Sequence, residues 1–174
     1  MKMQFTYNIF LIGFMGSGKS TVADYLCEKF DMDVVEMDQV IAERERMSIS
    51  DIFEKHGELY FRDLETKLLV ELQEKTNTVV SCGGGVAMRE CNVTEMKKNG
   101  KVVLLTAKPE TILERVENNH DRPLLENNKT VVYIAELMEK RREKYEAAAD
   151  MIIETDGKSA QKICEEMIQR LGEQ

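Results

Sequence analysis

The chain has 174 residues, of which 43% are apolar and 32% are charged, and its formal net charge is −8. This length and composition are those of one compact domain that buries its own core, whereas the acidic balance disfavours a nucleic-acid partner, which needs a basic face. No apolar run approaches the ~20 residues of a membrane span and no signal peptide precedes the first apolar run, so we expect a cytoplasmic protein with neither nucleic-acid nor membrane partners.

A short apolar run, a glycine-rich loop and a helical segment open the chain. Residues 8–12 predict a buried strand, and residues 21–30 predict an amphipathic helix. Between them, residues 13–20 have the sequence GFMGSGKS, which fits the phosphate-binding P-loop pattern G-x-x-x-x-G-K-[ST]. Glycines let several backbone N–H groups point at one anion, and the helix N-terminus adds partial positive charge. A chance glycine turn before a helix is the alternative, and the strand–loop–helix context argues against it.

The P-loop predicts a nucleotide site with a metal ion. Lys19 supplies a point charge to the β- and γ-phosphates, and the hydroxyl of Ser20 is suited to ligate Mg²⁺. Residues expected to hold the nucleotide here are Gly16, Ser17, Gly18, Lys19, Ser20 and Thr21.

The rest of the chain alternates strands with helices. Further strands are predicted at residues 34–37, 78–82, 101–106 and 151–154. Further helices are predicted at residues 38–45, 48–56, 59–75, 90–99, 109 to about 118, 131–148 and 159–171. Residues 119–129 are polar, lack periodicity and predict a mobile loop. Five strands alternating with helices predict an α/β fold, a parallel sheet covered on both faces, with its chemistry at the carboxyl ends of the strands.

Two acidic residues end the second predicted strand. Glu36 and Asp38 are two residues apart on an extended segment, so their side chains point the same way. One is suited to face Mg²⁺ and the other to face an incoming hydroxyl group. The alternative for Asp38 is that it only caps the helix that follows.

An arginine and three glycines predict a site for an anionic substrate. Arg62 lies on the predicted helix at 59–75, from which its guanidinium can bind a carboxylate as a bidentate fork; alternatively it pairs with Glu58 or Glu65 on the same helix. Gly83, Gly84 and Gly85 directly follow a strand. Three consecutive glycines indicate close approach of a ligand to the backbone, and a plain turn is the alternative.

More arginines lie toward the C-terminal half. Arg122 lies in the predicted mobile loop, where it could close over a phosphate as an arginine finger, although an ordinary solvated loop charge is the alternative. Arg115 precedes it on a helix, and Arg141, Arg142 and Tyr145 lie on the next helix.

Together these residues resemble the shikimate kinase family. The resemblance runs from residue 8 to about residue 171 and includes NIFLIGFMGSGKST, the Asp38–Gln39 pair, ISDIFEKHGELYFRDLE, CGGGV, RPLL and KR-x-x-x-Y at residues 140–145. It implies phosphorylation of the 3-hydroxyl of shikimate by ATP with Mg²⁺, a step toward aromatic amino acids. It also implies a five-stranded parallel sheet in the order 2-3-1-4-5. The chain would be a monomer with a core (7–37, 76–115, 147–174), a substrate-binding segment (38–75) and a lid (about 116–130).

The resemblance also implies roles for individual residues. The catalytic residues would be Lys19, Asp38 and Arg122. Shikimate would be bound by Asp38, Arg62, Gly83, Gly84, Gly85 and Arg141. Arg115 and Arg122 would join the P-loop residues around the nucleotide, and Ser20 and Glu36 would hold Mg²⁺.

Two positions depart from the family pattern. Glu36 stands where the family usually has Asp, which adds a methylene group to the metal site. The family often has Pro before the tyrosine of KR-x-x-x-Y, and its absence leaves Arg141 and Arg142 as alternatives for contacting the substrate, with Arg141 favoured by alignment. Two other functions stay open at this point: a kinase of the same fold acting on another small metabolite or a nucleotide, and a non-catalytic binding module.

Overall fold

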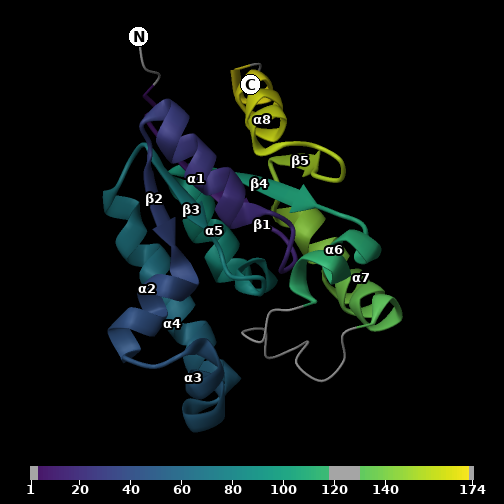
Figure 1. Cartoon of the computed structure of the whole chain (residues 1–174). Coiled ribbons are helices and arrows are strands. Elements are labelled where there is room, and N and C mark those ends of the chain that lie inside the picture. The colour runs from purple at the N-terminus through teal and green to yellow at the C-terminus, as the bar shows by residue number, and fades with distance from the viewer. Residues whose placement is uncertain (1–3, 118–129, 173–174) are drawn as a thin grey trace.

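A computed structural model describes residues 4–117 and 130–172 of the chain (Figure 1). Its five parallel strands form one sheet in the order β2-β3-β1-β4-β5, which confirms the expected order. The strands are β1 (Asn8–Ile12), β2 (Asp33–Glu36), β3 (Thr78–Ser81), β4 (Gly100–Thr106) and β5 (Met151–Glu154).

Helices cover both faces of this sheet. Alternate residues of β1 point to opposite faces: Ile9 and Leu11 belong to one buried apolar cluster, and Phe10 and Ile12 belong to the other. The first cluster is closed by α1 (Lys19–Phe30) and α8 (Ala160–Gly172). The second is closed mainly by α4 (Glu58–Glu71), α5 (Glu90–Lys98) and α7 (Val131–Ala148). Two buried faces explain why the central strands β1, β3 and β4 are largely buried, whereas the edge strands β2 and β5 are partly exposed.

The remaining helices flank the carboxyl ends of the strands. They are α2 (Met37–Glu45), α3 (Ile49–His56) and α6 (Pro109–Val116). There are also two short 3₁₀ turns: η1 (Leu72–Glu74) precedes β3 at the amino ends of the strands, and η2 (Val86–Met88) follows β3. In Figure 1, α2 and α3 lie on one side of the P-loop and α6 lies on the other. The P-loop is therefore flanked by α2 and α3, which follow the edge strand β2, and by α6, which follows β4.

Two element ends differ from the sequence-based expectation for clear physical reasons. The helix expected at 59–75 becomes 3₁₀ after Glu71, and the side chain of Asn8 donates hydrogen bonds to the carbonyl oxygens of Leu72 and Lys75 at 3.3 and 3.0 Å. The strand expected at 101–106 begins one residue earlier, at Gly100. A Cβ there would lie 2.5 Å from the ring of Phe10, so the glycine is required for packing.

The predicted mobile loop at 119–129, with Arg122 and most of the expected lid at 116–130, lies outside the described residues. Within the described residues, no helix combines the length and apolar character needed to cross a membrane.

Candidate active site

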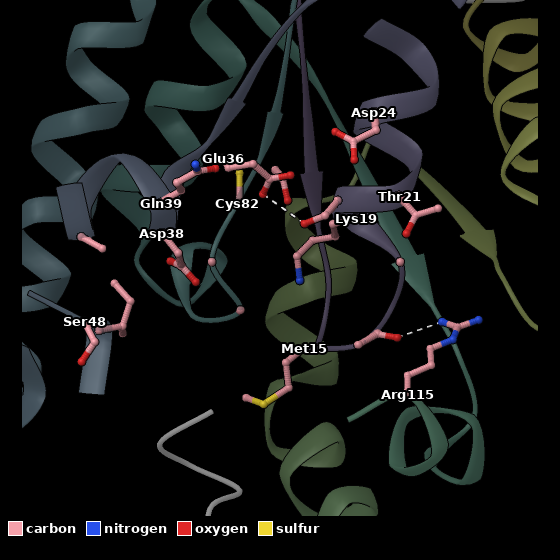
Figure 2. A pocket seen from close by; sticks show the side chains of 18 residues that line it. Met15, Lys19, Thr21, Asp24, Glu36, Asp38, Gln39, Ser48, Cys82 and Arg115 are labelled. Carbon is pink, nitrogen blue, oxygen red and sulfur yellow. Dashed lines mark hydrogen bonds between the residues drawn. The ribbon is translucent and has the colours of Figure 1, made fainter. Parts of the chain in front are cut away.

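A cleft of about 810 Å³ opens where the strands end at their carboxyl termini (Figure 2). Its walls come from the P-loop and the start of α1, from the end of β2 with α2, and from the segment after β3. In Figure 2, Asp38 lies to one side of Lys19 and Arg115 lies to the other. The cleft brings together residues from five separate segments of the sequence: 15–24, 36–42, 48–49, 81–84 and Arg115.

The backbone of the P-loop depends on its glycines. Gly13, Gly16 and Gly18 all have positive φ angles, a conformation that side chains rarely allow. A Cβ at Gly13 would also lie 2.4 Å from the carbonyl oxygen of Leu105. The ammonium group of Lys19 donates hydrogen bonds to the carbonyl oxygens of Gly13 and Phe14 at 2.7 and 3.3 Å. The lysine is thus held at the loop that would enclose a phosphate.

Ser20 and Glu36 meet at the metal position that the sequence predicts. The Ser20 hydroxyl donates to Oε2 of Glu36 at 3.1 Å, so the longer glutamate side chain reaches the hydroxyl. Burial raises the pKa of Glu36, while hydrogen bonds from Ser20 and Ser81 oppose that rise. A hydroxyl and a carboxylate are hard oxygen donors, which fit Mg²⁺ together with phosphate oxygens and water.

The carboxylate of Asp38 lines the cleft beside the glycine triplet. Asp38 is the second residue of α2, and the N-cap position belongs to Glu36. Asp38 is therefore not the N-cap of this helix. A Cβ on Gly83 would lie 2.9 Å from Oδ1 of Asp38, so only glycine lets the carboxylate approach the strand end this closely.

Arg62 is largely enclosed, with 15% of its side chain exposed. Its Nη1 donates to Oε1 of Glu65 at 2.9 Å, and its Nη2 donates to Oε1 of Glu58 at 3.1 Å. Both pairings proposed from the sequence are therefore present. The guanidinium also lies against Gly85, where a Cβ would be 2.5 Å from Nη1.

The glycine triplet serves the protein's own side chains. We expected the excess of glycine to admit a ligand. In the described structure, the protein's own side chains occupy this space. Asp38 and Glu65 lie against Gly83, and Arg62 lies against Gly85. Nη1 of Arg141 lies 3.1 Å from the point where a Cβ of Gly84 would stand. The triplet thus gathers two carboxylates and two guanidinium groups beside the P-loop.

Arg141 and Arg142 point in different directions. The guanidinium of Arg141 lies 5.7 Å from the ring centroid of Phe14 and donates to the hydroxyl of Tyr145, which in turn donates to the carbonyl oxygen of Gly84. The side chain of Arg142 is 57% exposed and pairs with Glu139 and Glu146. Of the two, Arg141 is the one beside the triplet, as the alignment of the KR pair indicates.

Arg115 lies on the far side of the P-loop from Asp38. Its Nη1 donates to the carbonyl oxygen of Gly16 at 2.8 Å and to the hydroxyl of Thr155 at 3.3 Å. This location suits the nucleotide end of the cleft.

Sequence reasoning did not identify Glu65 as part of the site. Its side chain is 0% exposed, and burial raises its pKa to about 7, with Arg62 opposing and Asp38 adding to the rise. The only signal in the sequence was its spacing of three residues from Arg62. That spacing predicts an ion pair but says nothing about burial beside Asp38.

Comparisons with known proteins agree with this geometry. A family model described as "Shikimate kinase" matches residues 15–172. The shikimate kinase of Persephonella marina is 45% identical over 164 residues, which cover 94% of this chain and 98% of that protein. The structure of the Acinetobacter baumannii shikimate kinase in complex with shikimate is similar with a TM-score of 0.90 and 33% identity, over 95% of this chain and 92% of that one. The structure of the Aquifex aeolicus shikimate kinase is similar with a TM-score of 0.81 and 37% sequence identity, and the match covers 95% of this chain and 96% of that one.

Proposed function

The chain belongs to the shikimate kinase family, and from this premise we propose that its cleft transfers the γ-phosphoryl group of ATP to the 3-hydroxyl of shikimate. ATP-dependent phosphorylation of shikimate, a step of aromatic amino acid biosynthesis, is the function of this enzyme. The observation that carries the assignment of the site is the convergence of Asp38, Arg62 and Arg141 on the glycine triplet beside the P-loop.

On the substrate side, the arrangement suits a small anion with hydroxyl groups. Arg62 and Arg141 approach neighbouring glycines of the triplet, where their planar forks can receive a carboxylate. Asp38 lines the cleft beside Gly83 of the same triplet, where it can orient the reacting hydroxyl and accept its proton. Phosphoryl transfer passes through a loose transition state, so alignment and charge neutralisation matter more than a strong base.

On the nucleotide side, Lys19 and the P-loop backbone bind the phosphates, and Arg115 lies toward the base. Ser20 and Glu36 would hold Mg²⁺, which when bound neutralises charge on the phosphate oxygens. The ammonium group of Lys19, which the carbonyl oxygens of Gly13 and Phe14 hold at the loop, would meet the incoming phosphate there. Arg122, which lies outside the described residues, is proposed to reach the phosphates from the lid.

An ADP-release assay over a panel of acceptors tests the assignment. Shikimate should be phosphorylated far faster than gluconate or AMP, because its ring holds a carboxylate and a 3-hydroxyl in a fixed relation that can reach the arginine pair and Asp38 together. Quinate carries both groups on a saturated ring, so its rate relative to shikimate measures how strictly the site selects the shape of the ring. Product identification by NMR checks which hydroxyl carries the phosphate. A preference for gluconate or AMP would assign the chain to another acceptor on the same fold.

We expect Arg62→Ala and Arg141→Ala each to weaken shikimate binding without weakening ATP binding. A charge-assisted hydrogen bond contributes ~1.5–3 kcal/mol, which corresponds to roughly a ten- to hundredfold change in Kd. Arg62→Ala should also lower Tm, since it leaves the buried Oε1 of Glu65 without its hydrogen-bond donor. Calorimetric titration with each ligand is the measurement. Arg142→Ala is the matched control, and a loss of shikimate affinity there, with none in Arg141→Ala, would reverse the assignment.

We expect Glu36→Gln to raise the Mg²⁺ concentration that ATP binding requires by roughly tenfold, because a neutral amide is a poorer partner for the cation and its water shell. Titration of the protein–ATP complex with Mn²⁺, followed by electron paramagnetic resonance, measures this without turnover. Asp24→Asn, on the rim of the same cleft, is the control for a general change in charge. Unchanged metal affinity in Glu36→Gln would remove Glu36 from the metal site.

We also propose that the protein is a cytoplasmic monomer without nucleic-acid or membrane partners. The net charge of −8 supports the absence of a nucleic-acid partner. Light scattering during size-exclusion chromatography tests the oligomeric state, and a dimer mass would reject the monomer.

A further inference from the structure

Glu65 is a fully buried carboxyl group that contacts the substrate side of the site. Its side chain is 0% exposed, and its Oε1 accepts a hydrogen bond from Nη1 of Arg62 at 2.9 Å. Within the described residues, its Oε2 is buried and has no hydrogen-bond partner. A charged carboxylate oxygen in such a place lacks both water and a donor, which disfavours the ionised form.

The unpartnered oxygen of Glu65 faces Asp38 across Gly83. The point where a Cβ of Gly83 would stand lies 2.6 Å from Oε2 of Glu65 and 2.9 Å from Oδ1 of Asp38. Two carboxyl groups that meet at one buried point repel each other when both are ionised, so such a pair favours holding one proton. Asp38 opens to the cleft whereas Glu65 does not, which places the proton on Glu65.

We propose that Glu65 is a positioning residue that carries this proton in the substrate-binding state, and thereby leaves the positive charge of Arg62 available to the carboxylate of the substrate. The inference rests on the proposed function, since it takes shikimate as the anion that Arg62 receives.

The charges around Glu65 support this role. The groups that face it are Arg62 on its own helix, Asp38 on α2, Cys82 after β3, Arg89 at the start of α5 and Tyr145 on α7. Arg89 is engaged by Asp63 at 3.0 Å.

The protonation of Glu65 therefore decides the net charge of the inner site. When Glu65 is neutral, the two positive charges of Arg62 and Arg141 exceed the one negative charge of Asp38. The inner site then has a net positive charge, which suits an anionic substrate. An ionised Glu65 cancels that surplus. Glu58, the other partner of Arg62, is 62% exposed, so water screens its charge.

The pKa of Glu65 is about 7, raised mainly by burial, so the proton leaves within an accessible pH range. As pH rises above 7, Glu65 ionises, the surplus positive charge disappears and shikimate should bind more weakly. By linkage, shikimate should raise the pKa of Glu65 when it binds, and above pH 7 binding should take up a proton.

Calorimetric titration of the wild-type protein with shikimate, at about pH 6 and about pH 8.5 and in two buffers of different ionisation enthalpy, tests the inference. We expect affinity to fall about tenfold between the two pH values, the change that one pKa unit of coupling produces. We also expect proton uptake on binding at the higher pH. The Glu65→Gln variant should bind shikimate equally well at both pH values without proton uptake, because the amide is neutral yet still accepts from Arg62.

The controls separate this role from a structural one. Glu58→Gln removes the exposed partner of Arg62 and should keep the wild-type pH dependence. A Glu65→Gln variant that binds shikimate more weakly by the same factor at both pH values would show a packing role and overturn the inference. Binding of shikimate to the wild-type protein without proton uptake at the higher pH would overturn it without any variant. Failure of shikimate to bind at either pH would instead overturn the proposed function, and this inference with it.

Discussion

Replacing Lys19 with methionine is expected to lower kcat at least about a hundredfold, which corresponds to ~3 kcal/mol of lost transition-state stabilisation. Lys19 is the first residue of α1, and its ammonium group lies at the carbonyl oxygens of Gly13 and Phe14, beside the place where the P-loop encloses a phosphate. Methionine keeps the length of the side chain but removes the charge that stabilises the transferred group. The ADP-release assay with shikimate measures the loss.

The control for this variant is Lys29→Met, which removes an exposed lysine from the last turn of the same helix and should leave kcat unchanged. Thermal unfolding should show that both variants keep the fold. Near-normal turnover by a folded Lys19→Met protein would reject the P-loop as the phosphate site.

Replacing Asp38 with asparagine is expected to lower kcat by about a hundredfold or more while changing the affinity for shikimate far less. Asparagine keeps the size of the side chain and still accepts one hydrogen bond, but it cannot take the proton of the reacting hydroxyl. Comparison of kcat from steady-state kinetics with Kd from titration separates the two effects.

The same variant has a second expected consequence. Asp38 contributes to the raised pKa of Glu65, so its neutralisation should lower that pKa and move the pH dependence of shikimate binding to lower pH. Asp33→Asn, which removes an exposed carboxylate at the other end of β2, should change neither kcat nor the pH profile. A kcat within threefold of the wild type would show that Asp38 is not needed for the chemistry.

Local patterns were sufficient to predict the secondary structure. Short apolar runs located the five strands to within one residue at either end. The central strands β1, β3 and β4 are buried along most of their length, because helices cover both faces of the sheet there. Ser48 accepts the backbone N–H of Asp51 at the start of α3, as its residue type predicts. The P-loop was evident because its spacing encodes a local backbone shape. The strand order came from the resemblance to a family, since pairing between distant strands has no local signal.

The sequence by itself therefore determined the fold, the phosphate loop and the family. Only the tertiary structure decided which charges meet. Spacing allowed Arg62 to pair with Glu58 or Glu65, and the fold buries one of these carboxylates and exposes the other. Neighbouring positions on α7 left Arg141 and Arg142 as alternatives, and the fold packs Arg141, not Arg142, against Phe14 and Gly84. The physical reason is that burial and electrostatic coupling depend on distances across the fold, whereas a sequence pattern reports only neighbours along the chain.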